Sequence, residues 1–231
     1  MKPTVLIVDD ERSARAELKR LLASFPEFEI IGEAKNADEA REQIKQQQPS
    51  ILFLDIQMPE CSGFELLESL DEVPEVVFTT AFDQYAVKAF EVSAFDYLLK
   101  PIREERFAQT VNRLLEKCKQ DQPAKQVFVK DGDRYHFVKW ETVHLIESMD
   151  NYARIFFNDQ KTWLKSSLNQ LEKMLNEQVF FRANRAQIIN LDYIEKIRAA
   201  TNGSLTVTLR TGHVIEISER RSVQFKKLGK F

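Results

Sequence analysis

Short apolar runs alternate with helical patterns along the first 118 residues of the chain. Each run has the length of a β-strand, and the apolar residues that follow it recur with helical spacing. Strands that are each followed by a helix form a parallel sheet covered on both faces, in right-handed βα units. This half is therefore predicted to adopt a doubly wound α/β fold. The expected strands are Val5–Val8, Ile30–Ile31, Ile51–Leu54, Val76–Phe78 and Phe95–Leu99, and the expected helices are Ala14–Leu22, Ala37–Ile44, Gly63–Leu70, Asp83–Phe90 and Glu105–Leu115.

Polar side chains stand at the carboxyl ends of four of these strands. They are Asp9 and Asp10 after the first strand, Asp55 after the third, Thr80 after the fourth and Lys100 after the fifth. Because the carboxyl ends of parallel strands meet at one edge of the sheet, we expect these groups to lie together. Three carboxylates favour a Mg²⁺ ion, and a hydroxyl with an ammonium group suits phosphoryl oxygens. Taken one at a time, such residues are more often surface or helix-capping groups.

The chain changes character after residue 118. Residues 119–126 are polar, lack apolar periodicity and contain Pro123, so they are predicted to link a domain at 1–118 to one at 127–231. The second domain is predicted to be mostly β, because short strand patterns are separated by Gly, Asn and Asp. The expected strands are Val127–Val129, Tyr135–Val138, His144–Ile146, Tyr152–Phe157, Lys161–Leu164, Ile194–Ile197, Leu205–Leu209 and Val214–Ile217, and the expected helices are Leu168–Leu175, capped by Ser166-Ser167, and Ser218–Leu228.

The two predicted domains carry net charges of opposite sign. Residues 1–118 contain 14 Lys and Arg against 23 Asp and Glu, a balance of −9, and the remaining residues contain 19 against 13, a balance of +6, which together give −3. A basic domain suits nucleic acid, although a surplus of this size also occurs on ordinary surfaces. The three His residues are too dispersed for a metal site, and the basic half shows no catalytic motif.

Several features favour a cytoplasmic protein without a membrane span. No window approaches about 18 unbroken apolar residues. The apolar run Val5–Val8 meets three acidic residues at once, which is unlike a signal peptide. The two cysteines, Cys61 and Cys118, form no CxxC pair, so neither a disulfide framework nor a zinc ribbon is indicated.

Four motifs in the acidic half point to a family: VLIVDDE at 5–11, LFLDIQMPECSG at 52–63, VVFTTAF at 76–82 and AFDYLLKPI at 94–102. With them, residues 3–118 closely resemble the receiver domains of two-component response regulators, which implies a flavodoxin-like form of the doubly wound fold. The resemblance implies that Asp55 accepts a phosphoryl group. It also implies that Asp9 and Asp10 bind Mg²⁺ together with Asp55 and the backbone carbonyl of Gln57.

The same resemblance assigns roles to residues on the last two strands. Thr80 and Lys100 would contact the phosphoryl oxygens, and the Lys100-Pro101 bond would be cis. Tyr97 stands where the family places an aromatic switch, which packs inward when the hydroxyl residue moves toward the phosphate. An aromatic residue on an apolar strand is also compatible with a purely structural place in the core.

Residues from about 125 to 231 resemble the LytTR DNA-binding domain, an elongated, mostly-β module. The stretches that carry this resemblance are LIESMDNYARIF at 145–156, SSLNQLEKML at 166–175, FFRANRAQIINLDYIEKI at 180–197 and VIEISERRSVQFKKL at 214–228. By motif position, Asn151, Arg185 and Arg220 would enter successive major grooves of duplex DNA. Arg221, Lys226 and Lys227 would contact phosphates.

The sequence departs from the common family pattern at two of these stretches. Many members read FxRxHRS, whereas Asn184 replaces the histidine here and Ala186 replaces the serine, and Glu219 is inserted among the bases of the last stretch. Arg185 and Arg220 are kept, so the change concerns the preferred DNA sequence. Two assignments stay open: Arg182 is as compatible with a salt bridge near Asp192 or Glu195 as with DNA reading, and Asn151 also suits a turn.

These observations predict a phosphorylation-controlled transcriptional regulator and not an enzyme. A sensor histidine kinase would phosphorylate Asp55, the receiver would form a homodimer, and paired basic domains would bind a direct-repeat promoter site in duplex DNA. The apolar residues that suggest a dimer contact are Ala89, Phe90, Val92 and Phe95.

Two alternatives belong to other classes. One is a receiver with an RNA- or protein-binding output, for which adjacent pairs such as Phe156-Phe157 and Phe180-Phe181 would have to supply stacking aromatics. The other is a Mg²⁺-dependent aspartyl phosphohydrolase. It is disfavoured because Gln57 stands where such a hydrolase needs a second acid.

Overall fold

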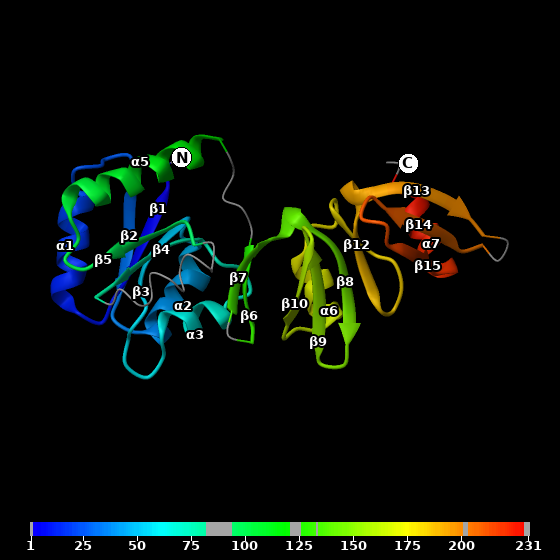
Figure 1. Cartoon of the computed structure of the whole chain (residues 1–231), viewed down its shortest axis with the longest axis horizontal. Coiled ribbons are helices and arrows are strands. Elements are labelled where there is room, and N and C mark those ends of the chain that lie inside the picture. Colours follow the sequence, from blue (N-terminus) through cyan, green and yellow to red (C-terminus); the bar gives the residue numbers. More distant parts are fainter. Residues whose placement is uncertain (1, 82–93, 121–125, 133, 201–202, 229–231) are drawn as a thin grey trace. The chain divides into compact units, whose positions relative to one another are not determined.

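The computed structural model describes residues 2–81, 94–120, 126–132, 134–200 and 203–228 (Figure 1). The chain forms two compact units, which divide between Trp140 and Glu141. Each unit has its own sheets and its own buried core, and each is described by itself below.

The first unit contains a five-stranded parallel sheet with the strand order β2-β1-β3-β4-β5. This confirms the predicted doubly wound α/β fold, with a strand at each of the five expected places. The expected helix at residues 83–90 lies outside the described residues, as do most of the residues of the suggested dimer contact. The elements are β1 (Thr4–Val8), α1 (Arg12–Leu22), β2 (Glu29–Ala34), α2 (Ala37–Gln47), β3 (Ile51–Asp55), α3 (Gly63–Glu68), β4 (Glu75–Thr80), β5 (Asp96–Leu99) and α5 (Glu104–Gln120).

Apolar side chains are buried on both faces of this sheet, as covering helices require. Alternate residues of β1 point to opposite faces: Val5 and Ile7 join one core cluster, and Leu6 and Val8 join the other. Helices α1 and α5 supply the first cluster, whereas α2 and α3 supply the second, and Figure 1 shows these helix pairs on opposite sides of the sheet. The central strands are therefore fully buried, which fixes the positions of their carboxyl ends.

A two-stranded hairpin, β6 (Gln126–Asp131) and β7 (Arg134–Lys139), also belongs to the first unit. Phe128 is only 1% exposed and lies in the core cluster that α2 and α3 form. The backbone N–H of Val73 donates to the carbonyl of Gln126 at 2.9 Å. The contacts therefore place the hairpin with the first unit, whereas the sequence assigns residues from 127 onward to the second domain. Most of the expected linker, 121–125, lies outside the described residues.

The second unit is mostly antiparallel β, as predicted. One sheet has the order β10-β9-β8-β12-β11, and the other has the order β13-β14-β15. Ser167 caps α6 through a capping box with Gln170, in agreement with the expected helix start. Strands β11 and β12 were not predicted from the sequence. The short η1 (Trp140–Thr142) spans the boundary between the units. The elements after it are β8 (Val143–Met149), β9 (Tyr152–Phe157), β10 (Gln160–Leu164), α6 (Leu168–Met174), β11 (Phe180–Arg182), β12 (Gln187–Asn190), η2 (Leu191–Tyr193), β13 (Ile194–Ala199), β14 (Leu205–Leu209), β15 (Val214–Ile217) and α7 (Glu219–Lys226).

Within the described ranges, no helix combines the length and the apolar character that a membrane crossing requires.

Candidate phosphoryl-acceptor site and nucleic-acid interface

Three carboxylates meet at the carboxyl edge of the first sheet. Asp9 follows β1 directly and Asp55 ends β3, and these two strands are neighbours. Oxygen atoms of Asp9, Asp10 and Asp55 all lie within 4.8 Å of one another. Asp9 and Asp55 are buried, whereas Asp10 is exposed. Because hard carboxylate oxygens with one side open to solvent are what Mg²⁺ prefers, this donor set fits the ion.

Lys100 supplies the positive charge at this edge. Its Nζ lies 2.7 Å from Oδ2 of Asp9 and 2.7 Å from Oδ2 of Asp55. Burial disfavours the ammonium group, but the hydrogen bonds to Asp55 and Asp9 outweigh burial and raise the pKa of Lys100. Burial raises the pKa of Asp9, and the hydrogen bond from Lys100 opposes that rise. The Lys100-Pro101 bond is cis, as the resemblance implies.

The remaining predicted residues of this site lie around Asp55. The backbone N–H of Gln57 donates to Oδ1 of Asp55 at 3.1 Å, and Gln57 itself is exposed. Thr80 is fully buried at the end of β4, and its carbonyl accepts the backbone N–H of Lys100 at 2.7 Å. Tyr97 is partly buried against the core cluster on the α2 and α3 face.

Gly63 is required by the close approach of α3 to the acceptor strand. A Cβ at this position would lie 2.4 Å from the backbone carbonyl oxygen of Asp55. Its N–H donates to the carbonyl of Ile56 at 2.9 Å, and Ser62 caps the helix at the same point. The loop after Asp55 is therefore fastened at both of its ends.

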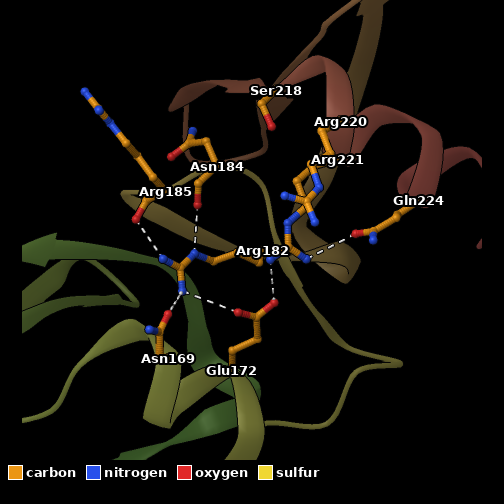
Figure 2. A pocket seen from close by; sticks show the side chains of 9 residues that line it. All are labelled: Asn169, Glu172, Arg182, Asn184, Arg185, Ser218, Arg220, Arg221 and Gln224. Atoms are coloured by element: carbon orange, nitrogen blue, oxygen red, sulfur yellow. Dashed lines mark hydrogen bonds and ion pairs between the residues drawn. The ribbon is translucent and has the colours of Figure 1, made fainter.

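Arginine side chains gather in the second unit around a hollow of about 330 Å³ (Figure 2). Arg185 comes from the loop between β11 and β12, and Arg220 and Arg221 come from α7. Arg185 and Arg220 are exposed, and Figure 2 shows the side chain of Arg185 extending away from the rest of the group. The structure thus brings together three of the residues predicted to contact DNA.

The other predicted DNA contacts do not line this hollow. Asn151 is exposed in the turn between β8 and β9, where the neighbouring Asp150 has a φ of 53°. Asp150 therefore takes the left-handed position of the turn. Lys226 and Lys227 are exposed at the end of α7.

Arg182 lies at the centre of the group, and its ionic partner is Glu172 of α6. Its Nη1 lies 3.4 Å from Oε2 of Glu172. The sequence suggested Asp192 or Glu195 instead, because the packing of α6 beside β11 is not visible in the pattern of residues. Burial lowers the pKa of Arg182, and the charge of Glu172 opposes that effect.

Comparison with known proteins identifies two families along the chain. Residues 5–112 match the response regulator receiver domain, and residues 133–230 match the LytTr DNA-binding domain. The chain is 39% identical over 234 residues to an uncharacterized response regulatory protein of Vibrio cholerae, covering 97% of this chain and 98% of that protein. It is 35% identical over 238 residues to the sensory transduction protein LytT of Enterococcus faecalis, again covering 97% and 98%. It is 37% identical over 228 residues to the transcriptional regulatory protein BtsR of Escherichia coli K12, covering 94% of each chain.

The chain is a LytTR-type response regulator. A receiver domain implies a histidine kinase as partner, and a LytTR domain implies DNA binding, so the protein belongs to a family of transcriptional regulators and not of enzymes.

Two residues of this LytTR-type response regulator were not assigned a role from its sequence. Glu172 links two arginines, because its Oε1 also lies 3.0 Å from Nη2 of Arg221. Asn184 joins two loops: its Nδ2 donates to the carbonyl of Glu216 at 2.8 Å, and its Oδ1 accepts the N–H of Ala186 at 2.9 Å. The departure from the family pattern at Asn184 was the only signal that pointed to this position.

Proposed function

We propose that a sensor histidine kinase transfers a phosphoryl group to Asp55 and that the modified receiver promotes DNA binding by the second unit. The observation that carries this proposal is the position of Lys100, 2.7 Å from both Asp55 and Asp9 at the edge where three carboxylates meet. An aspartate held beside an ammonium group and a candidate cation site is equipped to accept an anionic group.

Asp9, Asp10 and Asp55 would hold the Mg²⁺ ion, with the backbone carbonyl of Gln57 as a further ligand. When bound, the ion neutralises charge on the incoming phosphoryl group. Lys100 would exchange its contact with the Asp55 carboxylate for one with a phosphoryl oxygen, because phosphorylation adds charge and acceptor atoms at that carboxylate.

Thr80 and Tyr97 would couple the phosphorylation of Asp55 to a conformational change in the rest of the receiver. Thr80 stands next to Lys100 through the hydrogen bond between their backbones. In the proposed switch, the hydroxyl moves toward the phosphoryl group and Tyr97 packs further inward. This rearrangement would favour a receiver homodimer and would let two basic units bind a direct-repeat site together.

In the proposed DNA complex, Asn151, Arg185 and Arg220 read base edges, and Arg221, Lys226 and Lys227 contact phosphates. The exposure of Arg185, Arg220, Lys226 and Lys227 makes these side chains accessible to a duplex. The paired phenylalanines favour duplex DNA over RNA as the ligand. Phe157, Phe180 and Phe181 are buried, and Phe156 packs against the core, so these rings are poorly placed to stack on bases.

The test is duplex binding by the wild type and by Asp55→Ala, each with and without beryllofluoride and Mg²⁺. The duplex is first selected from a random library with the beryllofluoride-treated wild type. Tighter binding in the treated wild type alone is the expected result. Equal binding in all four samples would contradict control by phosphorylation but would still support DNA binding by the second unit. Binding to single strands but to no duplex would indicate that the second unit binds RNA instead of DNA.

A further inference from the structure

The guanidinium group of Arg182 is bonded to the backbone of the loop that carries Arg185. Its Nε donates to the carbonyl oxygen of Asn184 at 2.7 Å, and its Nη2 donates to the carbonyl oxygen of Arg185 at 2.7 Å. Figure 2 shows these two bonds fixing consecutive peptide units from the same side. The main chain on which the Arg185 side chain is mounted is therefore held by another arginine.

The third nitrogen of the Arg182 guanidinium group also forms polar contacts. Nη1 donates to Oδ1 of Asn169 at 3.3 Å and lies 3.4 Å from Oε2 of Glu172, both on α6. The Arg182 side chain is only 10% exposed. Its charge is therefore compensated inside the unit and is poorly placed to meet a phosphate, in contrast to the exposed Arg185 and Arg220.

The loop held by Arg182 is connected to the two other segments proposed to contact DNA. The carbonyl of Ala186 accepts the N–H of Ser148, near the end of β8, at 2.8 Å. On the other side, the carbonyl of Ala183 accepts the N–H of Ser218, next to α7, at 3.1 Å. Because this loop is hydrogen-bonded to both the end of β8 and the start of α7, its conformation determines the distance between those two segments.

We propose that Arg182 is a positioning residue for DNA sequence recognition, acting through the backbone at 184–185 on Arg185. This inference rests on the proposed function and adds to it. An arginine distinguishes one base pair from another by forming two hydrogen bonds to a base edge at once. A displaced Arg185 would therefore discriminate less between base pairs, even though its charge is unchanged. A planar guanidinium can serve two carbonyls and a carboxylate at once, whereas a lysine ammonium at the end of a flexible stem cannot hold the same fork.

The test is a double-mutant cycle with Arg182→Lys and Arg185→Ala in the full chain, treated with beryllofluoride and Mg²⁺. Affinities are measured for the selected duplex and for a scrambled duplex of the same length, over a range of salt concentrations. Arg182→Lys is expected to lower the specific-to-nonspecific ratio by about 5-fold to 150-fold, the range for one bidentate base contact. In the Arg185→Ala background the same change is expected to have little further effect, because the two residues act as a unit.

Two further readouts separate positioning from other roles. The salt dependence of binding to the scrambled duplex is measured with Arg182→Gln, because lysine would keep the charge, and it stays unchanged if Arg182 contacts no phosphate. Circular dichroism and the melting temperature show whether the variant is folded at the temperature of the assay, and Arg182→Gln replaces it in the same cycle if it is not. Arg210→Lys, at an exposed arginine of the same unit, is the matched control and is expected to keep the full ratio.

Each outcome bears on one proposal. The positioning role is overturned if folded Arg182→Lys keeps the wild-type ratio of specific to nonspecific affinity. It is also overturned if Arg182→Lys lowers this ratio equally in the wild-type and Arg185→Ala backgrounds. A reduced salt slope in Arg182→Gln would make Arg182 a phosphate contact and would also overturn the positioning role. If the wild type itself binds no duplex, the proposed function fails, and that result is distinguishable because it appears before any variant is compared.

Discussion

The ring of Phe64 stacks on the ring of Tyr135, with their centroids 4.8 Å apart and their planes 13° from parallel. Phe64 is the second residue of α3, and Gly63 before it lies against the carbonyl of Asp55. Tyr135 belongs to the hairpin β6–β7, whose Phe128 is buried in the same cluster. The hairpin therefore contacts the helix that begins where the loop after the acceptor aspartate ends.

The first prediction is that Phe128→Ala destabilises the receiver unit. The change removes a buried aromatic ring that contacts both Phe64 and Tyr135, so we expect the free energy of unfolding to fall by about 3–5 kcal/mol. Urea unfolding of the full chain measures the loss. Arg134→Ala, at an exposed position of the same hairpin, is expected to unfold like the wild type. Equal stability of both variants would show that the hairpin adds nothing to the receiver.

The place of this hairpin could not be predicted from the sequence, although most of the fold could. The apolar runs of the first half gave the five strands because buried parallel strands leave a local pattern. The partner of Phe128 and Tyr135 is Phe64, far earlier in the chain, and no local pattern reports such a contact. Strands β11 and β12 were missed for a related reason: the first has only three residues, and the charged stretch around Arg182 breaks its apolar pattern.

The second prediction concerns Lys100, which compensates the charges of Asp9 and Asp55. Lys100→Ala leaves these buried carboxylates beside each other, so we expect the free energy of unfolding without Mg²⁺ to fall by about 3 kcal/mol. Added Mg²⁺ should then stabilise the variant more than the wild type, because the ion no longer competes with an ammonium group. Thermal unfolding with and without saturating Mg²⁺ measures both effects, and Lys45→Ala, at an exposed lysine of α2, is the control. A smaller Mg²⁺ response in Lys100→Ala would contradict this account.

The third prediction is a pH dependence that arises from His144. This side chain is 2% exposed, and neither ring nitrogen has a hydrogen-bond partner among the described residues. Burial lowers the pKa of His144 from 6.5, the nearby His213 lowers it further, and Asp159 opposes the shift. The unfolded chain therefore binds a proton that the folded unit does not. The free energy of unfolding should fall as the pH drops below about 6.5.

Between about pH 7.5 and about pH 5.5, His144 is expected to account for at most about 1.4 kcal/mol of that loss. His144→Phe should remove this part of the pH dependence, because phenylalanine does not titrate and fits beside Phe156 and Tyr193, whose rings already contact the imidazole. Urea unfolding followed by tryptophan fluorescence gives the comparison. An unchanged profile in His144→Phe would assign the effect to other groups.

The candidate sites differ in how far the sequence could define them. Asp9, Asp55 and Lys100 were predicted to lie together because a parallel sheet brings strand ends to one edge, so topology alone determines their proximity. The arginine group follows no such rule. Arg182 meets Glu172 only because α6 packs beside β11, and that packing depends on side chains distributed over the whole unit.

The last prediction is that Glu172→Gln strengthens nonspecific binding to duplex DNA. Glu172 lies 3.0 Å from Arg221 and 3.4 Å from Arg182, so it neutralises charge beside the proposed phosphate contacts. Glutamine keeps a hydrogen-bond acceptor but releases Arg221, which can then pair with a phosphate. We expect the affinity for a scrambled duplex to rise several-fold at low salt, and the slope of log K against log[salt] to steepen by up to about 1. Glu177→Gln makes the same change in net charge at an exposed glutamate after α6, so a comparable rise in that variant would show that total charge is responsible. Weaker binding by Glu172→Gln would instead mean that Glu172 is needed to hold Arg221 in place.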